Sequence, residues 1–217
     1  MTDLLRKEFR LAASPLSYFF VISAFLTFVP GYPILLGAFF TTLGIFYSFQ
    51  TSRENKDIDF SLLLPVSKAD IVKGKFAFCL IIELVSFVIM TAATVVRMTL
   101  LKGAPAYTSN ALMCANLTFL GFALLIFGLF NSVFIGGFFR TAYYFGKPFI
   151  LYCIVSLVVI GIAETLHHLP GLAAFNSFGF EKLTLQLPAL IIGLIAFSVL
   201  TALSVNESVK HFESADM

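Results

Sequence analysis

The 217-residue sequence contains no tryptophan, only three cysteines and few charged residues, and the last two shortages each argue against a class of protein. Cys79, Cys114 and Cys153 lie inside apolar runs without metal-ligand spacing, so we interpret them as packing residues. Charged residues make up 12% of the chain and sum to a net charge of +2, which argues against a nucleic-acid partner.

Phosphate-binding loops are also missing. No G-x-x-x-x-G-K-[ST] motif occurs, because Lys75 is followed by Phe76 and Lys147 by Pro148. Any ATP and magnesium on which the protein depends must therefore be bound by another polypeptide. We predict that this chain is not an enzyme and has no catalytic or cofactor-binding residues.

A metal site has weak support. Glu164, His167 and His168 stand at helical spacing, but neither a cysteine nor a second carboxylate accompanies them. We therefore predict no metal site and interpret the histidines as solvated residues at the membrane interface.

Long apolar runs are what the sequence has in abundance. Hydrophobic residues are 59% of the chain, and mean hydropathy is +0.96. Six runs reach the roughly 20 residues that a membrane-spanning helix needs. They cover about 11–30, 31–51, 75–101, 110–138, 148–165 and 184–205. The short connections leave no room for a soluble domain, so residues 1–217 are predicted to form a single all-α transmembrane domain.

The basic residues are unevenly distributed about these runs. If both termini are cytoplasmic, eleven of the 14 Lys and Arg lie inside and only three, Arg97, Lys102 and Lys182, lie at or near the outside. Positively charged residues concentrate in cytoplasmic loops of membrane proteins. The sequence therefore predicts a multi-pass protein of the cell membrane with cytoplasmic N- and C-termini.

The first residues predict an amphipathic helix and a hairpin. Residues 2–13 place Asp3, Arg6, Lys7 and Arg10 on one helical face, so this helix should lie along the inner membrane surface. The run 30–33, Pro-Gly-Tyr-Pro, predicts a tight outer turn between spans one and two. Small residues along one face of span two and of span four predict close helix packing, with a substrate path or a subunit interface as the alternative. These residues are Gly37, Thr41, Gly44 and Ser48, and Gly128, Ser132 and Gly136.

The cytoplasmic segment 52–74 combines charges with apolar residues that have no soluble core to enter. Residues 57–64 predict a short helix ended by Pro65, and Ser67 with Asp70 predicts a capping box for the next helix. Two interpretations of the apolar cluster stay open. The helix could dip into the lipid headgroups, or it could dock a cytosolic partner, since charges surround an apolar ridge as in a protein interface.

Two charged residues within span three need an explanation. Glu83 lies about 12 Å along the helix from Lys75, deep in the apolar layer. It serves either the translocation path and conformational coupling or a structural hydrogen bond with a neighbouring helix or subunit. Arg97 lies near the outer end, where its side chain is expected to extend outward to water.

The outer segment 165–183 is too apolar for a solvated loop and too short for a span. We predict a re-entrant or interfacial element whose backbone is covered by protein. Phe175, Phe178 and Phe180 could gate an exit there, although anchoring is the simpler role.

Two motifs carry a resemblance to a known family. LLRKEFRL precedes span one, and residues 54–75 read ENKDIDFSLLLPVSKADIVKGK. A run of leucines, Pro-Val-Ser, a basic residue and Gly-Lys at the start of span three resembles the membrane subunits of ABC-2-type ATP-binding-cassette transporters. The small size is similar to bacterial permeases that export amphipathic peptides such as phenol-soluble modulins, or that confer immunity to peptide antibiotics.

The resemblance implies a type V exporter-like fold, with the N-terminal helix as the elbow helix and residues 55–64 as the coupling helix. It implies a separate nucleotide-binding ATPase subunit as partner, a second permease copy in a homodimer or a paralogous heterodimer, and an amphipathic peptide or small-molecule cargo. The residues expected at the ATPase are Asp57, Ile58, Asp59, Phe60, Leu62, Leu63, Leu64 and Pro65.

Two alternatives remain. One is an immunity or scaffold protein without transport activity, which would work without an ATPase. The other is an ion-coupled carrier that depends on Glu83 and uses an ion gradient in place of ATP.

Overall fold

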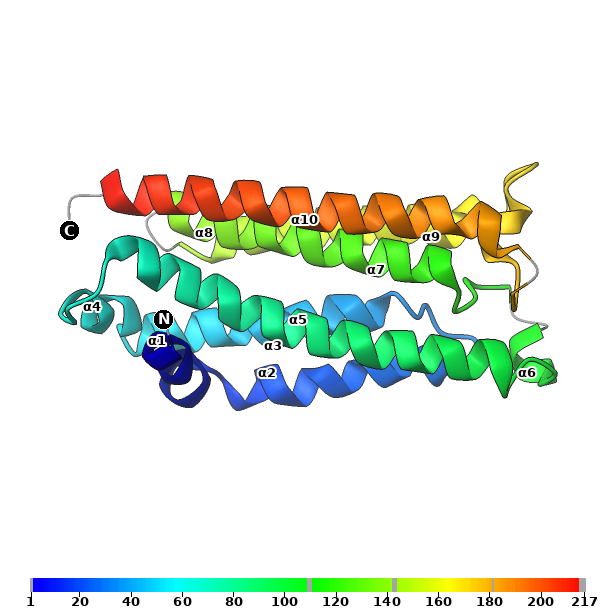
Figure 1. Cartoon of the computed structure of the whole chain (residues 1–217), viewed down its shortest axis with the longest axis horizontal. Coiled ribbons are helices and arrows are strands. Elements are labelled where there is room, and N and C mark those ends of the chain that lie inside the picture. Colours follow the sequence, from blue (N-terminus) through cyan, green and yellow to red (C-terminus); the bar gives the residue numbers. More distant parts are fainter. Residues whose placement is uncertain (1, 109–110, 142–143, 181, 215–217) are drawn as a thin grey trace.

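The computed structural model describes residues 2–108, 111–141, 144–180 and 182–214, most of them in helices, with no strand among them. The predicted all-α class is confirmed. Long helices run along the length of the molecule, and short helices cap its two ends (Figure 1). The long elements are α2 (Pro15–Phe19) with η2 (Phe20–Phe28), α3 (Leu36–Glu54), α5 (Lys68–Thr99), α7 (Leu117–Leu129) with η3 (Phe130–Ile135) and α8 (Gly136–Arg140), α9 (Gly146–Leu166) and α10 (Leu183–Ser214).

Four of these helices are long and apolar enough to cross a membrane: Lys68–Thr99, Leu117–Arg140, Gly146–Leu166 and Leu183–Ser214. A fifth span is obtained if Pro15–Phe28 is counted together with Asp3–Ala12, from which it bends by 97°. The described residues thus contain four or five candidate spans where the sequence predicts six. The remaining helix, α3, is less apolar because its last two turns are polar.

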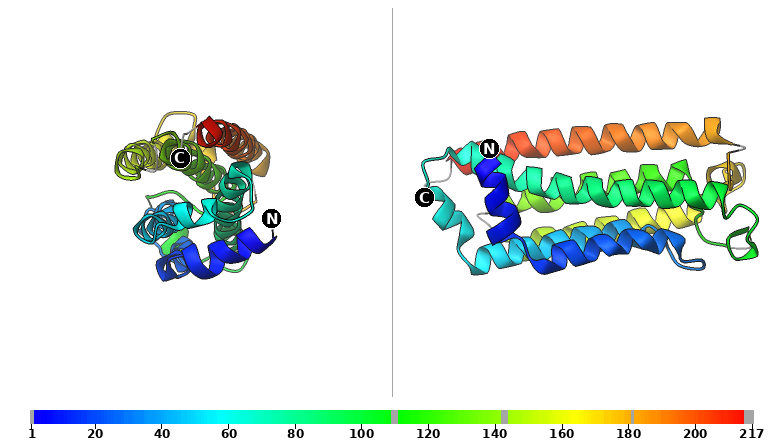
Figure 2. Two further views of the ribbon diagram at one scale, coloured as in Figure 1. Left: turned by 90° about the vertical axis from the view of Figure 1, so that its left-hand side faces the viewer. Right: turned by 60° about the horizontal axis from the view of Figure 1, so that its bottom comes forward.

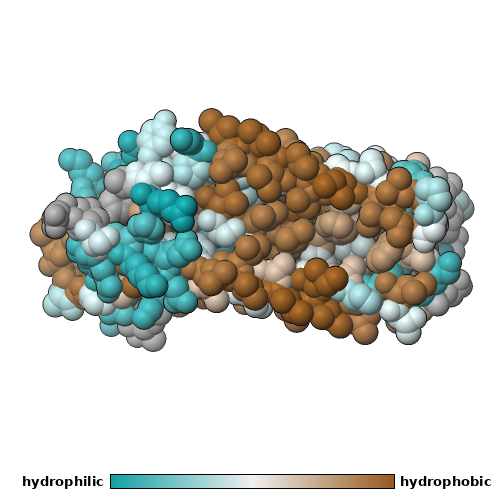
Figure 3. All heavy atoms as spheres, turned by 90° about the horizontal axis from the view of Figure 1, so that it is seen from above, coloured by the Kyte–Doolittle hydropathy of each residue, from teal (hydrophilic) through white to brown (hydrophobic). Residues whose placement is uncertain are grey.

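The surface agrees with a membrane position. A hydrophobic band covers the middle of the face seen from the α10 side, and the end that holds α1 (Thr2–Lys7) and α4 (Asp57–Leu62) is hydrophilic (Figures 1 and 3). The band comes from the outward faces of α5, α9 and α10, on which large aliphatic side chains such as Val88, Leu157 and Ile192 are more than half exposed. Lipid is the solvent that such a surface requires.

A helical hairpin is present where the sequence predicts a tight turn, with limits that differ from the prediction. η2 ends at Phe28 and α3 begins at Leu36, and Gly31 takes a positive φ of 71° in the turn between them. The small residues of α3 pack against this first helix. A Cβ on Gly37 would collide with the Ser23 carbonyl, and the Ser17 hydroxyl donates to the Gly44 carbonyl at 2.6 Å. This face is a packing face within the chain.

A second close crossing joins α7 to α10. The backbones touch at Gly121 and Gly193, where a Cβ on either residue would collide with the other helix. Gly128 and Gly136, predicted as packing residues, likewise lie against Phe197 and Ser204 of α10. In lipid, where burial of apolar surface gives little driving force, this close approach favours association of the helices.

At the end remote from α4, the outer segment includes η4 (Ala173–Asn176); residue 181 lies outside the described residues. Amide side chains bind its backbone. Asn116 Nδ2 donates to the Phe175 carbonyl at 2.9 Å, and Gln186 Nε2 donates to the Ser177 carbonyl at 3.0 Å. These bonds explain how irregular backbone is tolerated in so apolar a segment.

Candidate functional site

Four charged side chains are buried together at the end of the bundle that holds both α1 and α4. They are Lys7 of α1, Glu8 of η1 (Glu8–Ala12), Asp57 of α4 and Lys75 of α5, each at most 9% exposed. The N-terminal helix lies across the end of the bundle and brings its charges over α5 (Figure 2). The four residues, called here the charge cluster, join three segments that are far apart in the sequence.

Each lysine of the charge cluster contacts both carboxylates. Lys7 Nζ lies 2.8 Å from Asp57 Oδ1 and 3.1 Å from Glu8 Oε1. Lys75 Nζ lies 2.8 Å from Glu8 Oε2 and 2.9 Å from Asp57 Oδ2. The two positive and two negative charges compensate one another, which is the condition under which charges are buried.

Two serines complete the charge cluster. Ser52 of α3 accepts from Lys75 Nζ at 3.0 Å and donates to Asp57 Oδ2 at 3.0 Å. Ser61 accepts from Lys7 Nζ at 2.5 Å and donates to the Asp57 carbonyl at 2.6 Å. The inner face of α4 is therefore fastened to α1, α3 and α5 at once.

Local sequence explains how α4 reaches this position. α3 ends at Glu54, and Lys56 takes a left-handed conformation (φ 50°, ψ 37°) that reverses the chain before α4 begins. After α4, Ser67 caps α5 by accepting from the Asp70 amide at 3.1 Å, and its hydroxyl donates to the Asp70 carboxylate at 2.6 Å. The predicted start of the helix at Ser67 and Asp70 is thus confirmed.

The structure divides the predicted docking residues into two sets. Asp57 and Ile58 are buried, at 7% and 6% exposure, so their side chains do not belong to an exposed docking surface. The reason is that Asp57 is held by two lysines while Ile58 enters the core beneath α4. Phe60 and Leu63 are 54% and 84% exposed and form an apolar pair on the outer face of α4. Asp59 and Pro65 are exposed beside them, and Leu62 and Leu64 are partly buried.

The N-terminal helix also differs from the prediction. Helical spacing predicts Lys7 on the polar face, but Lys7 is buried with Leu4, Glu8 and Ala12, while Leu11 is 68% exposed. Pairing with the two carboxylates overrides the simple division into polar and apolar faces. The sequence signal that could have revealed this arrangement is Lys75, a cation at the first position of a long apolar run.

The charge cluster lowers the pKa of the Asp57 carboxyl. Burial by itself raises the pKa of this carboxyl, but Lys75 and Lys7 outweigh burial, so the pKa lies below its ordinary value of 3.8. A carboxylate whose pKa is lowered by folding stabilises the native state above its unfolded pKa and loses that contribution as pH falls through the folded value.

A pH titration tests this contribution. The difference in thermal stability between the wild type and Asp57→Asn should be constant near neutral pH and shrink as pH falls below about 4, because the unfolded carboxyl binds protons there first. Thermal unfolding of the detergent-solubilised protein measures it. A difference that stays constant down to about pH 3 would contradict an ionised, paired Asp57.

Glu83 lies in the interior and is fully buried. Asn131 Nδ2, from the π-helical turn η3, donates to Glu83 Oε2 and to Thr201 Oγ1, both at 3.0 Å, and the Ser204 hydroxyl donates to the Asn131 carbonyl at 2.7 Å. These bonds connect α5, η3 and α10. Of the two roles that the sequence left open, the structure shows the hydrogen bond with a neighbouring helix.

Substitution of Glu83 separates hydrogen bonding from charge. Glu83→Gln keeps an acceptor for Asn131 and should change the free energy of unfolding by less than about 1 kcal/mol, whereas Glu83→Leu leaves a buried N–H unpaired and should cost about 1–3 kcal/mol. Denaturation in detergent measures both, with Leu84→Ala on the lipid-facing side as the control. Equal losses for the two Glu83 variants would indicate that charge matters.

Arg97 does not extend outward as predicted. Its side chain is fully buried, Nη1 donates to the Thr27 carbonyl at 2.7 Å, and the guanidinium lies 4.3 Å from the centre of the Tyr107 ring. Tyr107 in turn donates to the Phe28 carbonyl at 2.9 Å. Arg97 therefore fastens α5 to the end of η2, since a carbonyl and an aromatic face stabilise a buried cation.

The other sequence candidates are dispersed. Phe175 lines a cavity between α7, α9 and α10, Phe178 is partly buried away from that lining, and Phe180 is 50% exposed. Of the three, only Phe175 lines this cavity. Glu164 accepts from the Met113 amide at 2.8 Å, and His167 lies 3.1 Å from the Ala111 carbonyl, so both connect outer loops.

The bundle of long apolar helices and the hydrophobic band define a multi-pass membrane protein. Residues 3–213 match the family described as ABC-2 family transporter protein, and the chain belongs to this family. It is a membrane component of an ABC-2 transporter, a role that is typically not catalytic and that implies association with an ABC ATPase. Neither the curated proteins nor the solved structures contain a match to the chain.

Proposed function

We propose that this chain is the permease subunit of an ATP-driven exporter that moves amphipathic peptides or other amphipathic compounds out of a bacterial cell. The observation that carries the proposal is the two-sided α4. Its outer face presents Phe60 and Leu63, and its inner face is fastened by Asp57 to Lys7 and Lys75. An ATPase that binds the outer face of α4 would move α1 and α5 together with α4.

In this proposal α4 is the coupling helix, and α1 with η1 is the elbow helix. Six crossings follow if Pro15–Phe28 and α3 both count as spans, which their position beside α5 supports. The N-terminal helix α1 and the last turns of α10 lie at the same end of the bundle as α4 (Figure 1). Eleven of the 14 basic residues belong to segments at this end, which supports a cytoplasmic orientation.

The assembly would contain two ATPase subunits and two permease copies, which are identical or paralogous. Rigid transmission from α4 through Pro65 into α5 would rock the two permeases relative to each other as the ATPases close. ATP and magnesium would be held by the ATPase subunits, with no cofactor in this chain.

Co-purification tests the proposal. After gentle detergent extraction, an ABC ATPase should accompany the chain in stoichiometric amount, and ATP depletion at a clamped ion gradient should stop export. A scaffold or immunity protein would keep its activity without any ATPase. An ion-coupled carrier would continue transport without ATP and would lose it in Glu83→Gln.

A further inference from the structure

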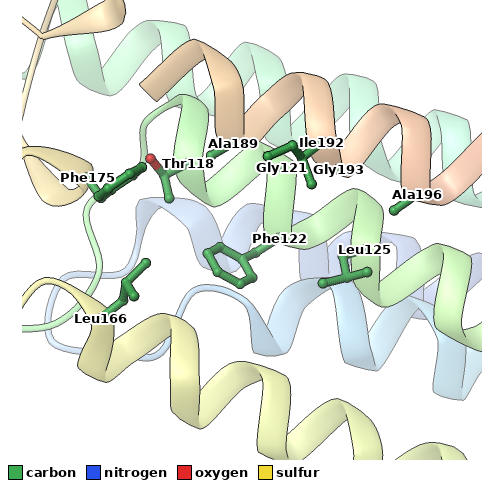
Figure 4. A pocket seen from close by; sticks show the side chains of 10 residues that line it. All are labelled: Thr118, Gly121, Phe122, Leu125, Leu166, Phe175, Ala189, Ile192, Gly193 and Ala196. Atoms are coloured by element: carbon green, nitrogen blue, oxygen red, sulfur yellow. The ribbon is translucent and has the colours of Figure 1, made fainter. Parts of the chain in front are cut away.

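A cavity of about 180 Å³ lies between α7, α9 and α10 in the half of the bundle remote from α4. Its lining comes from one face of α7, one face of α10 and the end of α9 (Figure 4). On α7 the lining runs from Thr118 to Leu125, which is about 10 Å along the helix axis. The cavity is therefore elongated in the direction of the bundle.

Small residues create this space. Gly121 and Gly193 bring the backbones of α7 and α10 into contact, while Ala189 and Ala196 leave the α10 side of the cavity without bulky side chains. α9 forms the opposite wall only through Leu166 at its last turn (Figure 4). Protein interiors rarely leave such a volume empty, because the lining atoms lose their packing contacts.

The cavity opens toward the lipid-facing surface. Ile192 lines it and is 66% exposed, and it belongs to the same outward stripe of α10 as Leu185 and Ile195. The lining is almost entirely apolar. The hydrocarbon chains of the surrounding bilayer therefore contact the opening directly. Their local concentration there is higher than that of any soluble ligand.

One polar group lies at the end of the cavity near the membrane surface. Thr118 is fully buried, and its hydroxyl has no hydrogen-bond partner among the described residues. Phe175 and Leu166 line the same end (Figure 4). An acyl chain that enters the cavity at this end would run along α7 and α10 toward Leu125 and Ala196.

We propose that the cavity binds one acyl chain of a phospholipid from the membrane leaflet remote from α4. Cavities of about 150 Å³ lined by aliphatic and aromatic side chains stay dry and bind apolar molecules, so the volume suits a segment of a hydrocarbon chain. The bound lipid fills the space between α9 and the α7–α10 pair. The site depends only on the membrane position of these helices and not on the nature of the cargo.

The absence of tryptophan provides the test. Phe122→Trp places a single fluorophore on the cavity wall of the 217-residue chain, reconstituted in nanodiscs with increasing fractions of phosphatidylglycerol brominated on its acyl chains. If one acyl chain occupies the cavity, the tryptophan fluorescence that remains decreases linearly with the fraction of brominated lipid. Val88→Trp, on the lipid-facing side of α5, contacts several chains, and its fluorescence should fall more steeply.

Filling the cavity provides the second comparison. Ala196→Phe, or Ala189→Leu if the first variant does not fold, should remove most of the quenching of Phe122→Trp. Ala202→Phe is the matched control, because Ala202 is exposed on the same helix outside the cavity lining. Circular dichroism and gel filtration identify the folded variants.

Two results would overturn the proposal. If Phe122→Trp is quenched as steeply as Val88→Trp and neither filling variant changes this, only the surrounding lipid reaches that part of α7. If brominated lipid does not quench Phe122→Trp at any fraction, protein such as a second copy of the chain covers the opening.

Discussion

Phe60→Asp combined with Leu63→Asp is expected to abolish association with the ATPase subunit and to stop export with it. The two side chains are 54% and 84% exposed on α4, and nothing on the described part of this chain covers them. Apolar anchors at the centre of an interface contribute about 2 kcal/mol each when they are hot spots, which corresponds to roughly 30-fold weaker binding per side chain. Pull-down of the ATPase with the purified permease measures the loss.

Leu100→Asp is the matched control, since Leu100 is 80% exposed at the opposite end of α5. It should leave ATPase association unchanged. Full capture of the ATPase by the Phe60 and Leu63 double variant would contradict docking through α4. Quenching of Leu63→Trp by brominated lipid in the assembled transporter would instead show that α4 dips into the headgroups.

Lys75→Met is expected to destabilise the protein by about 3–5 kcal/mol, because it leaves two buried carboxylates with only one lysine. The exposed pair of Arg140 and Glu207, with a similar N–O distance of 2.8 Å and side-chain exposures of 61% and 58%, is the internal control. Arg140→Met should change stability by less than about 1 kcal/mol. Thermal unfolding in detergent compares the two variants.

The same substitution tests coupling. In Lys75→Met the outer face of α4 is untouched, so the ATPase should still bind where the protein folds, while export per ATP hydrolysed falls because α4 is no longer fastened to α5. Replacing all four charges with Met or Leu should restore stability, since apolar packing often equals a buried ion pair. A Lys75→Met protein as stable as Arg140→Met would show that the charge cluster does not hold the helices together.

Several features could be predicted because they depend on local chemistry. The cap formed by Ser67 and Asp70 needs only neighbouring residues, and the turn at Gly31 follows from two flanking prolines. The packing faces of Gly37 and Gly128 follow from helical periodicity. Each of these features lies within a few residues of the sequence pattern that predicts it.

Other features depend on which helices become neighbours. Position near a helix end predicts that Arg97 reaches water, yet a carbonyl from η2 and the ring of Tyr107 keep it inside. The resemblance places Asp57 on a docking surface, yet Lys7 and Lys75 hold it in the interior. In both cases the contacting residues are remote in the sequence, and no periodic pattern of the sequence predicts the contact.

Hydropathy, basic residues and capping act over short distances along the chain, so the amino acids alone were sufficient to establish the helical class, the membrane environment and the family motifs around residues 54–75. That α4 buries one face against its own chain and leaves the other exposed became visible only in three dimensions. The reason is that a buried charge is stable only where opposite charges converge on it, and here that convergence requires α1, α4 and α5 to meet in space.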